Sequence, residues 1–148
     1  MKKAPPIFRL VYVSRNRLRG DPAAMEREVA NILAVSRRNN VRAGVTGALL
    51  FSADCFAQTL EGRRDAVEAV FERIQCDPRH SNTVVLQLEP AAAVFADWSM
   101  AYGGRIEEER TRFDWLTHGD EPAVREGAAD AVMDLLRGVV LRAMPVLG

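Results

Sequence analysis

The sequence has few of the residues that build metal sites, disulfide frameworks or strongly charged surfaces. Its 148 residues include two cysteines and two histidines, namely Cys55, Cys76, His80 and His118. The cysteines have no CxxC spacing and the histidines lie in no ligand cluster, so we expect no metal site. Lys and Arg total 20, as do Asp and Glu, and the formal net charge is zero. A neutral chain has no overall field to attract a polyanion, so nucleic acid is not an expected partner.

Long hydrophobic runs and common catalytic motifs are also missing. The basic residues Lys2 and Lys3 are not followed by a long apolar stretch before Arg9, and no run reaches the length of a membrane span. We therefore expect no signal peptide, no transmembrane helix and no membrane partner, and a cytoplasmic protein. The motifs GxSxG, HExxH, GxGxxG and the P-loop do not occur. The remaining composition, 48% hydrophobic and 27% charged, is typical of one globular domain, or one domain with a tail.

Hydrophobic periodicity predicts five strands and two helices before residue 103. Strands are expected at 7–14, 44–52, 54–62, 83–89 and 95–101, and helices at 22–40 and 64–76. Asp21 suits the N-cap of the first helix and Pro22 its first turn. The order βαββαββ predicts an α+β fold, a ferredoxin-like sandwich with two helices on one face of a mixed sheet. That topology makes the first and third strands central neighbours, which places Tyr12 beside Gln58.

The C-terminal part of the chain is predicted to be helical. A glycine pair at 103–104 indicates a boundary between the sandwich, residues 1–102, and a C-terminal helical extension, residues 103–148. Residues 106–115 are compatible with a short helix, and Pro122 opens a longer one. The longer helix has a wide apolar stripe, which has to cover either the open face of the sheet or another chain.

One polar residue lies on the apolar face of a predicted strand. Gln58 alternates with Phe56 and Leu60, and a buried amide with unmade hydrogen bonds costs about 1–3 kcal/mol, so it needs a partner. Other polar or oxidisable residues are expected to converge near it. Each of them also has an ordinary structural interpretation, as a helix end, a turn or a packed strand: Tyr12, Asn39, Asn40, Arg73, Asp77, Arg79, His80, Trp98 and Met100.

Five stretches, taken in order and spacing, resemble one known family. They are LVYVS (10–14), SRRNNVRAGVTGALLFS (36–52), FAQTLEG (56–62), RIQCDPRH (73–80) and FADWSM (95–100). Together they look like the BLUF domain of blue-light receptors that use flavin, over about residues 7–102. The family's ferredoxin-like fold agrees with the element order predicted above. One departure is visible at 91–93, where three alanines replace basic residues that many relatives carry, and this bears on surface contacts rather than on flavin binding.

The resemblance implies a set of site residues. Tyr12 and Gln58 match the photochemical pair of the family. The cofactor, FAD or alternatively FMN, would be bound without a covalent bond by Ile32, Ser36, Asn39, Asn40, Phe56, Arg73, Ile74, Asp77, Arg79 and His80. Trp98 and Met100 match the tryptophan and methionine of the last strand, which would relay the signal.

The resemblance also implies a mechanism. Excited flavin would take an electron from Tyr12, whose proton moves to Gln58, and the amide would rotate or tautomerise to give a reversible red-shifted state. We expect no enzymatic activity, and a signal passed to an unidentified protein partner or through a homo-oligomer. The C-terminal helix either responds to light or simply covers the sheet. The alternatives are a flavin-dependent redox enzyme, with Cys55 or Cys76 as electron partner, and a cofactor-free ferredoxin-like interaction module.

Overall fold

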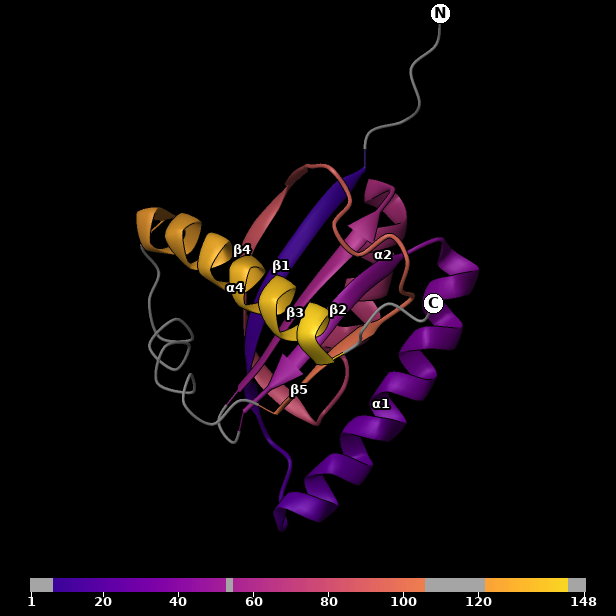
Figure 1. Cartoon of the computed structure of the whole chain (residues 1–148), viewed down its shortest axis with the longest axis vertical. Coiled ribbons are helices and arrows are strands. Elements are labelled where there is room, and N and C mark those ends of the chain that lie inside the picture. The colour runs from indigo at the N-terminus through magenta and orange to yellow at the C-terminus, as the bar shows by residue number, and fades with distance from the viewer. Residues whose placement is uncertain (1–6, 53–54, 106–121, 144–148) are drawn as a thin grey trace, which may run out of the picture.

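The computed structural model describes residues 7–52, 55–105 and 122–143 (Figure 1). The elements, in chain order, are β1 (Phe8–Asn16), α1 (Pro22–Ala43), β2 (Thr46–Phe51), β3 (Cys55–Gly62), α2 (Arg64–Gln75), β4 (His80–Pro90), β5 (Ala101–Arg105) and α4 (Pro122–Ala143). The short helix predicted at 106–115 lies outside the described residues. The longer C-terminal helix is present as α4, beginning at the predicted Pro122.

The strands form one mixed sheet in the order β4-β1-β3-β2-β5. Strand β1 pairs antiparallel with β3 and β4, β2 pairs antiparallel with β3, and β5 runs parallel to β2. The predicted α+β ferredoxin-like sandwich is therefore confirmed. The register of β1 and β3 sets Tyr12 directly opposite Gln58, as the topology predicted.

The two faces of the sheet bury two separate cores. Leu10 and Tyr12 of β1 pack with α1 and α2, whereas the alternate residues Val11 and Val13 pack with α4. Figure 1 shows α4 crossing one face of the sheet while α2 lies behind the other. The buried stripe of α4, which includes Val132, Leu136 and Val140, thus covers the sheet face opposite the helix pair, one of the two predicted roles.

Helix α1 is one turn longer than predicted. The carboxylate of Asp21 caps its start by accepting a hydrogen bond from the backbone N–H of Ala24 over 2.8 Å. Its end is set by Gly44, whose φ of 71° is left-handed and whose N–H bonds the carbonyls of the last turn. The expected end at Asn39 and Asn40 is therefore wrong. Asn40 lies inside the last turn, and its side chain is buried.

The last predicted strand begins later than expected. Residues 91–100 form an irregular segment, and β5 starts at Ala101. The reason is that the backbone N–H groups of Val94 and Phe95 donate to the carboxylate of Glu61, and the N–H of Trp98 closes a turn onto the carbonyl of Phe95. Because these N–H groups already have hydrogen-bond partners, they are not available to pair with a neighbouring strand. The boundary predicted between residues 102 and 103 falls within β5, and the division into two parts stays a prediction.

Candidate functional site

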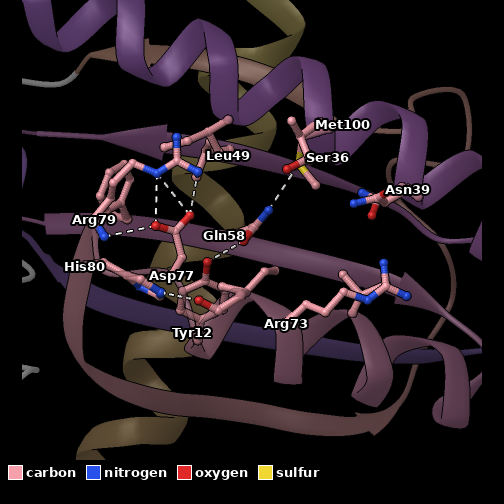
Figure 2. A pocket seen from close by; sticks show the side chains of 16 residues that line it. Tyr12, Ser36, Asn39, Leu49, Gln58, Arg73, Asp77, Arg79, His80 and Met100 are labelled. Atoms are coloured by element: carbon pink, nitrogen blue, oxygen red, sulfur yellow. Dashed lines mark hydrogen bonds and ion pairs between the residues drawn. The ribbon is translucent and has the colours of Figure 1, made fainter.

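A pocket lies between α1 and α2, with the central strands of the sheet as its floor. Its empty space, counted out to the open mouth, is about 780 Å³. Figure 2 shows side chains entering it from both helices and from the strands that run between them in this view. The lining residues are Tyr12, Ile32, Val35, Ser36, Asn39, Asn40, Leu49, Phe56, Gln58, Val70, Arg73, Ile74, Asp77, Arg79, His80 and Met100.

Tyr12, Gln58 and Met100 form a hydrogen-bonded row on the pocket floor (Figure 2). The hydroxyl of Tyr12 donates to Oε1 of Gln58, and Nε2 of Gln58 donates to Sδ of Met100 over 3.4 Å. All three side chains are buried, with 3%, 3% and 1% exposed. Burial, assisted by the negative charge of Asp77, raises the pKa of Tyr12 far above its ordinary value of 10. Tyr12 is therefore a neutral phenol whose proton points at the amide oxygen of Gln58.

Asn40 contributes a buried acceptor that the described residues leave unsatisfied. Its Nδ2 donates to the carbonyl oxygen of Ser99 over 2.7 Å, while its Oδ1 has no hydrogen-bond partner in the part of the chain that the structure describes. Buried polar atoms in native proteins are nearly always paired. Because Asn40 lines the pocket, the unpaired oxygen calls for a ligand that donates an N–H or O–H group at this point.

The other end of the pocket carries an ion pair. Both carboxylate oxygens of Asp77 accept hydrogen bonds from the Arg79 guanidinium, at 2.7–3.1 Å. Partial burial alone would raise the pKa of Asp77, but the hydrogen bonds and charge of Arg79, with a further contribution from His80, hold it below its usual value. The hydrogen bond to Asp77 in turn raises the pKa of Arg79. The Asp77 carboxylate and the Arg79 guanidinium therefore both stay charged, and the hydrogen bonds between them fix their orientation.

His80 joins three elements beside Tyr12. Its Nε2 lies 2.6 Å from the carbonyl oxygen of Ile74, and its Nδ1 lies 2.7 Å from Oγ of Ser14. Because a carbonyl oxygen can only accept, Nε2 carries a proton, and in the neutral ring Nδ1 accepts from the Ser14 hydroxyl. Ser14 is fully buried and lies outside the pocket, so this pair holds β4 and the end of α2 against β1 rather than exposing a nucleophile.

The structure brings together thirteen of the fourteen site residues that the sequence predicted. The exception is Trp98, which lies outside the pocket and packs with Phe95 in the core beneath α4. Its position in the last strand was also wrong, as was that of Met100, because both precede β5. Met100 does reach the pocket. The two predicted relay residues thus occupy opposite cores of the protein.

Three apolar lining residues were not predicted, namely Val35, Leu49 and Val70. Helical spacing could have found two of them. Val35 follows Ile32 by one turn on α1, and Val70 precedes Arg73 and Ile74 by one turn on α2. Leu49 could have been found as the cross-strand partner of Gln58.

Within residues 7–52, 55–105 and 122–143, no group of three or more His, Cys, Asp or Glu side chains could hold a metal ion. The pocket instead combines two apolar helix faces, a buried unpaired acceptor and a phenol bonded to an amide. This arrangement fits a flat, partly polar organic ligand.

Comparison with known proteins agrees with this geometry. The BLUF family, described as sensors of blue-light using FAD, matches residues 7–101. The chain is 34% identical over 84 residues to the blue light- and temperature-regulated antirepressor BluF of Escherichia coli (strain K12), over 57% of this chain and 20% of that protein. It is 33% identical over 75 residues to the photoactivated adenylate cyclase subunit beta of Euglena longa, over 49% of this chain and 9% of that subunit. The chain thus spans only a small part of these relatives.

Solved structures match over more of their length. The dark-state structure of the BLUF protein BlrB is 31% identical, with a TM-score of 0.65, and the match covers 95% of this chain and 98% of that one. Klebsiella pneumoniae BlrP1 with FMN and cyclic diGMP is 29% identical, with a TM-score of 0.57, over 68% of this chain and 26% of that one. Since the family match spans most of the chain and both sequence and fold agree with it, this protein is a member of the BLUF family of blue-light sensors that use FAD.

Proposed function

We propose that this chain is a blue-light photosensor that holds FAD, without a covalent bond, in the pocket between α1 and α2. Tyr12 and Gln58 are its photochemical pair. The observation that carries the proposal is the hydrogen-bonded row of Tyr12, Gln58 and Met100 on the pocket floor of a BLUF domain.

The residues present fit a flavin. The unpaired Oδ1 of Asn40 is suited to accept from the imide N–H of an isoalloxazine ring. Ile32 and Ile74, from the two facing helices, would flank such a ring, and Asp77 with Arg79 offers charges to its polar substituents. The remaining proposed contacts are Ser36, Asn39, Phe56, Arg73 and His80. When bound, the flavin supplies absorption of blue light and, in its excited state, a strong one-electron oxidant.

Tyr12 is the electron and proton donor in this proposal. Its raised pKa keeps the phenol protonated throughout the neutral range, so the donor is always in one state. A phenol that has lost an electron is a strong acid. The proton on Oη then has an acceptor already in contact, Oε1 of Gln58, and it moves along that hydrogen bond without rearrangement of the backbone.

Gln58 converts this proton movement into a changed hydrogen-bond pattern. Its amide has an acceptor at one end and a donor at the other. The donor end bonds a thioether sulfur, which is a weak acceptor, so little is lost when the amide rotates or changes tautomer. Either change reverses what Gln58 presents to the pocket, and reversal in darkness restores the original pattern. A glutamate or a leucine at this position could not make the exchange.

The output is proposed to leave through protein contacts. We infer that the chain is not itself an enzyme, that it is cytoplasmic, and that it signals to a protein partner or within a homo-oligomer. Relatives with cyclase and antirepressor names show that outputs differ among related proteins. Among the described helices, none has the length and apolarity to cross a bilayer.

The signal is proposed to pass from Met100 to Trp98 and then to α4. The support for this route is that Trp98 packs in the same core as α4, whereas Met100 contacts Gln58. Hydrogen exchange of α4 amides in dark and light tests it. Faster exchange in light is expected, and identical protection in both states contradicts a role of α4 in signalling.

Absorption spectroscopy tests the function itself. The purified protein is expected to be yellow, with a flavin spectrum that shifts to the red under blue light and returns in darkness. Tyr12→Phe and Gln58→Leu should keep the flavin and lose the reversible shift, and normal cycling of Tyr12→Phe contradicts the donor role. A colourless protein that takes up no flavin favours an interaction module, and lasting bleaching with turnover favours a redox enzyme. Mass spectrometry of the released cofactor distinguishes FAD from FMN.

A further inference from the structure

Residues 94–100, called here the crossing segment, pass from one core of the protein to the other. Phe95 is buried in the core beneath α4, and five residues later Met100 is buried in the core of α1 and α2. Between them, the carbonyl of Trp98 accepts from the N–H of Gly47 at the outer edge of β2 over 3.2 Å. The crossing segment is therefore a direct physical connection between the pocket and the α4 side of the sheet.

Strand β3 holds the crossing segment at both ends. Gln58 bonds Met100 on the pocket face, as described above. Glu61, three residues further along β3, points to the opposite face because side chains alternate along a strand. Its carboxylate accepts from the N–H of Val94 at 2.9 and 3.1 Å, and from the N–H of Phe95 at 2.8 Å.

The carboxylate of Glu61 is buried and has hydrogen-bond donors at both of its oxygens. Its side chain is 1% exposed, and Arg9 lies 3.4 Å from its second oxygen while also donating to the carbonyl of Ala92 over 2.7 Å. A buried carboxylate that lost its donors would bear a large desolvation cost, so the two backbone amides are held firmly. The photochemistry proposed above makes no use of this group.

We propose that Glu61 is a positioning residue of the photosensor, which holds the crossing segment so that Sδ of Met100 lies at Nε2 of Gln58. Its photochemical consequence rests on the proposed function. The length of the segment makes the coupling close, because five residues from Phe95 to Met100 span at most about 18 Å when fully extended. Further contacts of the segment come from α1, where the side chain of Asn40 donates to the carbonyl of Ser99 and that of Arg37 to the carbonyl of Met100. Glu61 thus fixes the start of the segment to the sheet, while the N–H of Gly47 and the two α1 side chains fix its later residues.

The coupling runs in both directions. A change at the amide of Gln58 alters the bond to Met100, and the segment fixed by Glu61 carries that change to Phe95 and Trp98 beneath α4. Loosening of the Glu61 hold changes, in turn, how often Met100 lies at Gln58 in the dark. The dark-recovery rate therefore depends on Glu61, although this residue lies on the face away from the pocket.

Glu61→Gln tests the proposal, with Thr59→Val as the matched control. Glutamine keeps the size of the side chain and one acceptor oxygen but loses the charge and the second acceptor. Thr59 is buried on the same strand and face, and its hydroxyl has no hydrogen-bond partner among the described residues, so valine removes a buried polar group without releasing the segment. Both variants are studied as flavin-loaded protein, first in the dark and then through one cycle of illumination and dark recovery.

Three measurements decide the outcome. Amide exchange at Val94 and Phe95 is expected to accelerate about tenfold or more in Glu61→Gln, because a hydrogen bond to a charged group is stronger than one to a neutral amide. The methyl resonance of Met100, assigned with Met100→Leu, is expected to shift, and dark recovery is expected to change severalfold. Thr59→Val should match the wild type in all three.

Two results would overturn the proposal. If Glu61→Gln accelerates exchange but leaves the Met100 resonance and the recovery rate unchanged, Glu61 only stabilises the loop. If amide exchange at Val94 and Phe95 is unchanged in Glu61→Gln, the carboxylate of Glu61 does not fix these two amides. A protein that binds no flavin would contradict the proposed function, and the Met100 resonance would still decide whether Glu61 positions Met100.

Discussion

The side-chain amide of Asn40 donates to the carbonyl oxygen of Ser99 over 2.7 Å, across 59 residues of sequence, and its own oxygen, at the pocket, has no partner among the described residues. One residue of α1 therefore orients the segment that carries Met100 and offers an acceptor to a ligand. This double role explains why a polar side chain is tolerated at 1% exposure near the end of a helix.

Replacement of Asn40 by alanine is expected to weaken flavin binding about 10- to 100-fold, because a buried hydrogen bond of about 1–3 kcal/mol is lost. Titration of the apoprotein with FAD, followed by quenching of flavin fluorescence, measures the affinity. Asn31→Ala, at an exposed position of the same helix, is the control and should bind as the wild type does. Equal affinities of Asn40→Ala and the wild type would show that the unpaired oxygen does not meet the flavin.

Tyr12 is expected to make the protein less stable above about pH 10. Its pKa is raised in the folded state, so between the unfolded and folded pKa values the folded protein retains a proton that the unfolded chain has lost. The free energy of unfolding should then fall with rising pH by about 1.4 kcal/mol per unit. Urea unfolding of the wild type and Tyr12→Phe from pH 8 to pH 11 checks this. The difference between the two should be constant below pH 10, and equal slopes above it would contradict a buried neutral phenol.

Asp77 is expected to influence the ionisation of Tyr12. Its negative charge is the secondary cause of the raised pKa of Tyr12, after burial, so Asp77→Asn should lower that pKa while leaving it above 10. Ultraviolet titration of the tyrosinate band measures it, and the chain has only two tyrosines, Tyr12 and Tyr102. Tyr102→Phe isolates the signal of Tyr12. An unchanged titration in Asp77→Asn would show that solvent screens the charge.

Much of this architecture follows from local patterns. The alternation of apolar residues and the order of elements place Tyr12 opposite Gln58, because a ferredoxin-like topology makes their strands neighbours. The motifs at 36–52 and 73–80 name most of the polar lining through the family resemblance that they carry. Ser36, Asn39, Asn40 and Arg73 lie on α1 and α2, whereas Asp77, Arg79 and His80 follow the end of α2. These features depend on residues close in sequence or on a common topology.

The features that the sequence did not reveal depend on contacts over long separations. Trp98 and Met100 are two residues apart, as on one face of a strand, but the carboxylate of Glu61, more than thirty residues earlier, accepts from the backbone N–H groups of Val94 and Phe95. The segment is irregular, and Trp98 and Met100 lie in different cores. Similarly, α1 continues past Asn40 because Gly44 provides the left-handed end and the carbonyl of Ser99 satisfies the asparagine amide. No local periodicity encodes either contact.

The tight approach of β2 to β3 gives a final prediction about stability. A Cβ on Gly47 would lie 2.1 Å from the backbone oxygen of Thr59, so Gly47→Ala requires strand displacement and should destabilise the protein by about 1–3 kcal/mol or more. Gly138→Ala on α4 is the matched control, since an added Cβ there meets no described atom within 4 Å. It should stabilise the protein by about 0.5–1 kcal/mol through helix propensity. Urea unfolding of both variants measures the two effects. If Gly47→Ala were as stable as the wild type, β2 and β3 would have to be able to separate at this point without loss of stability.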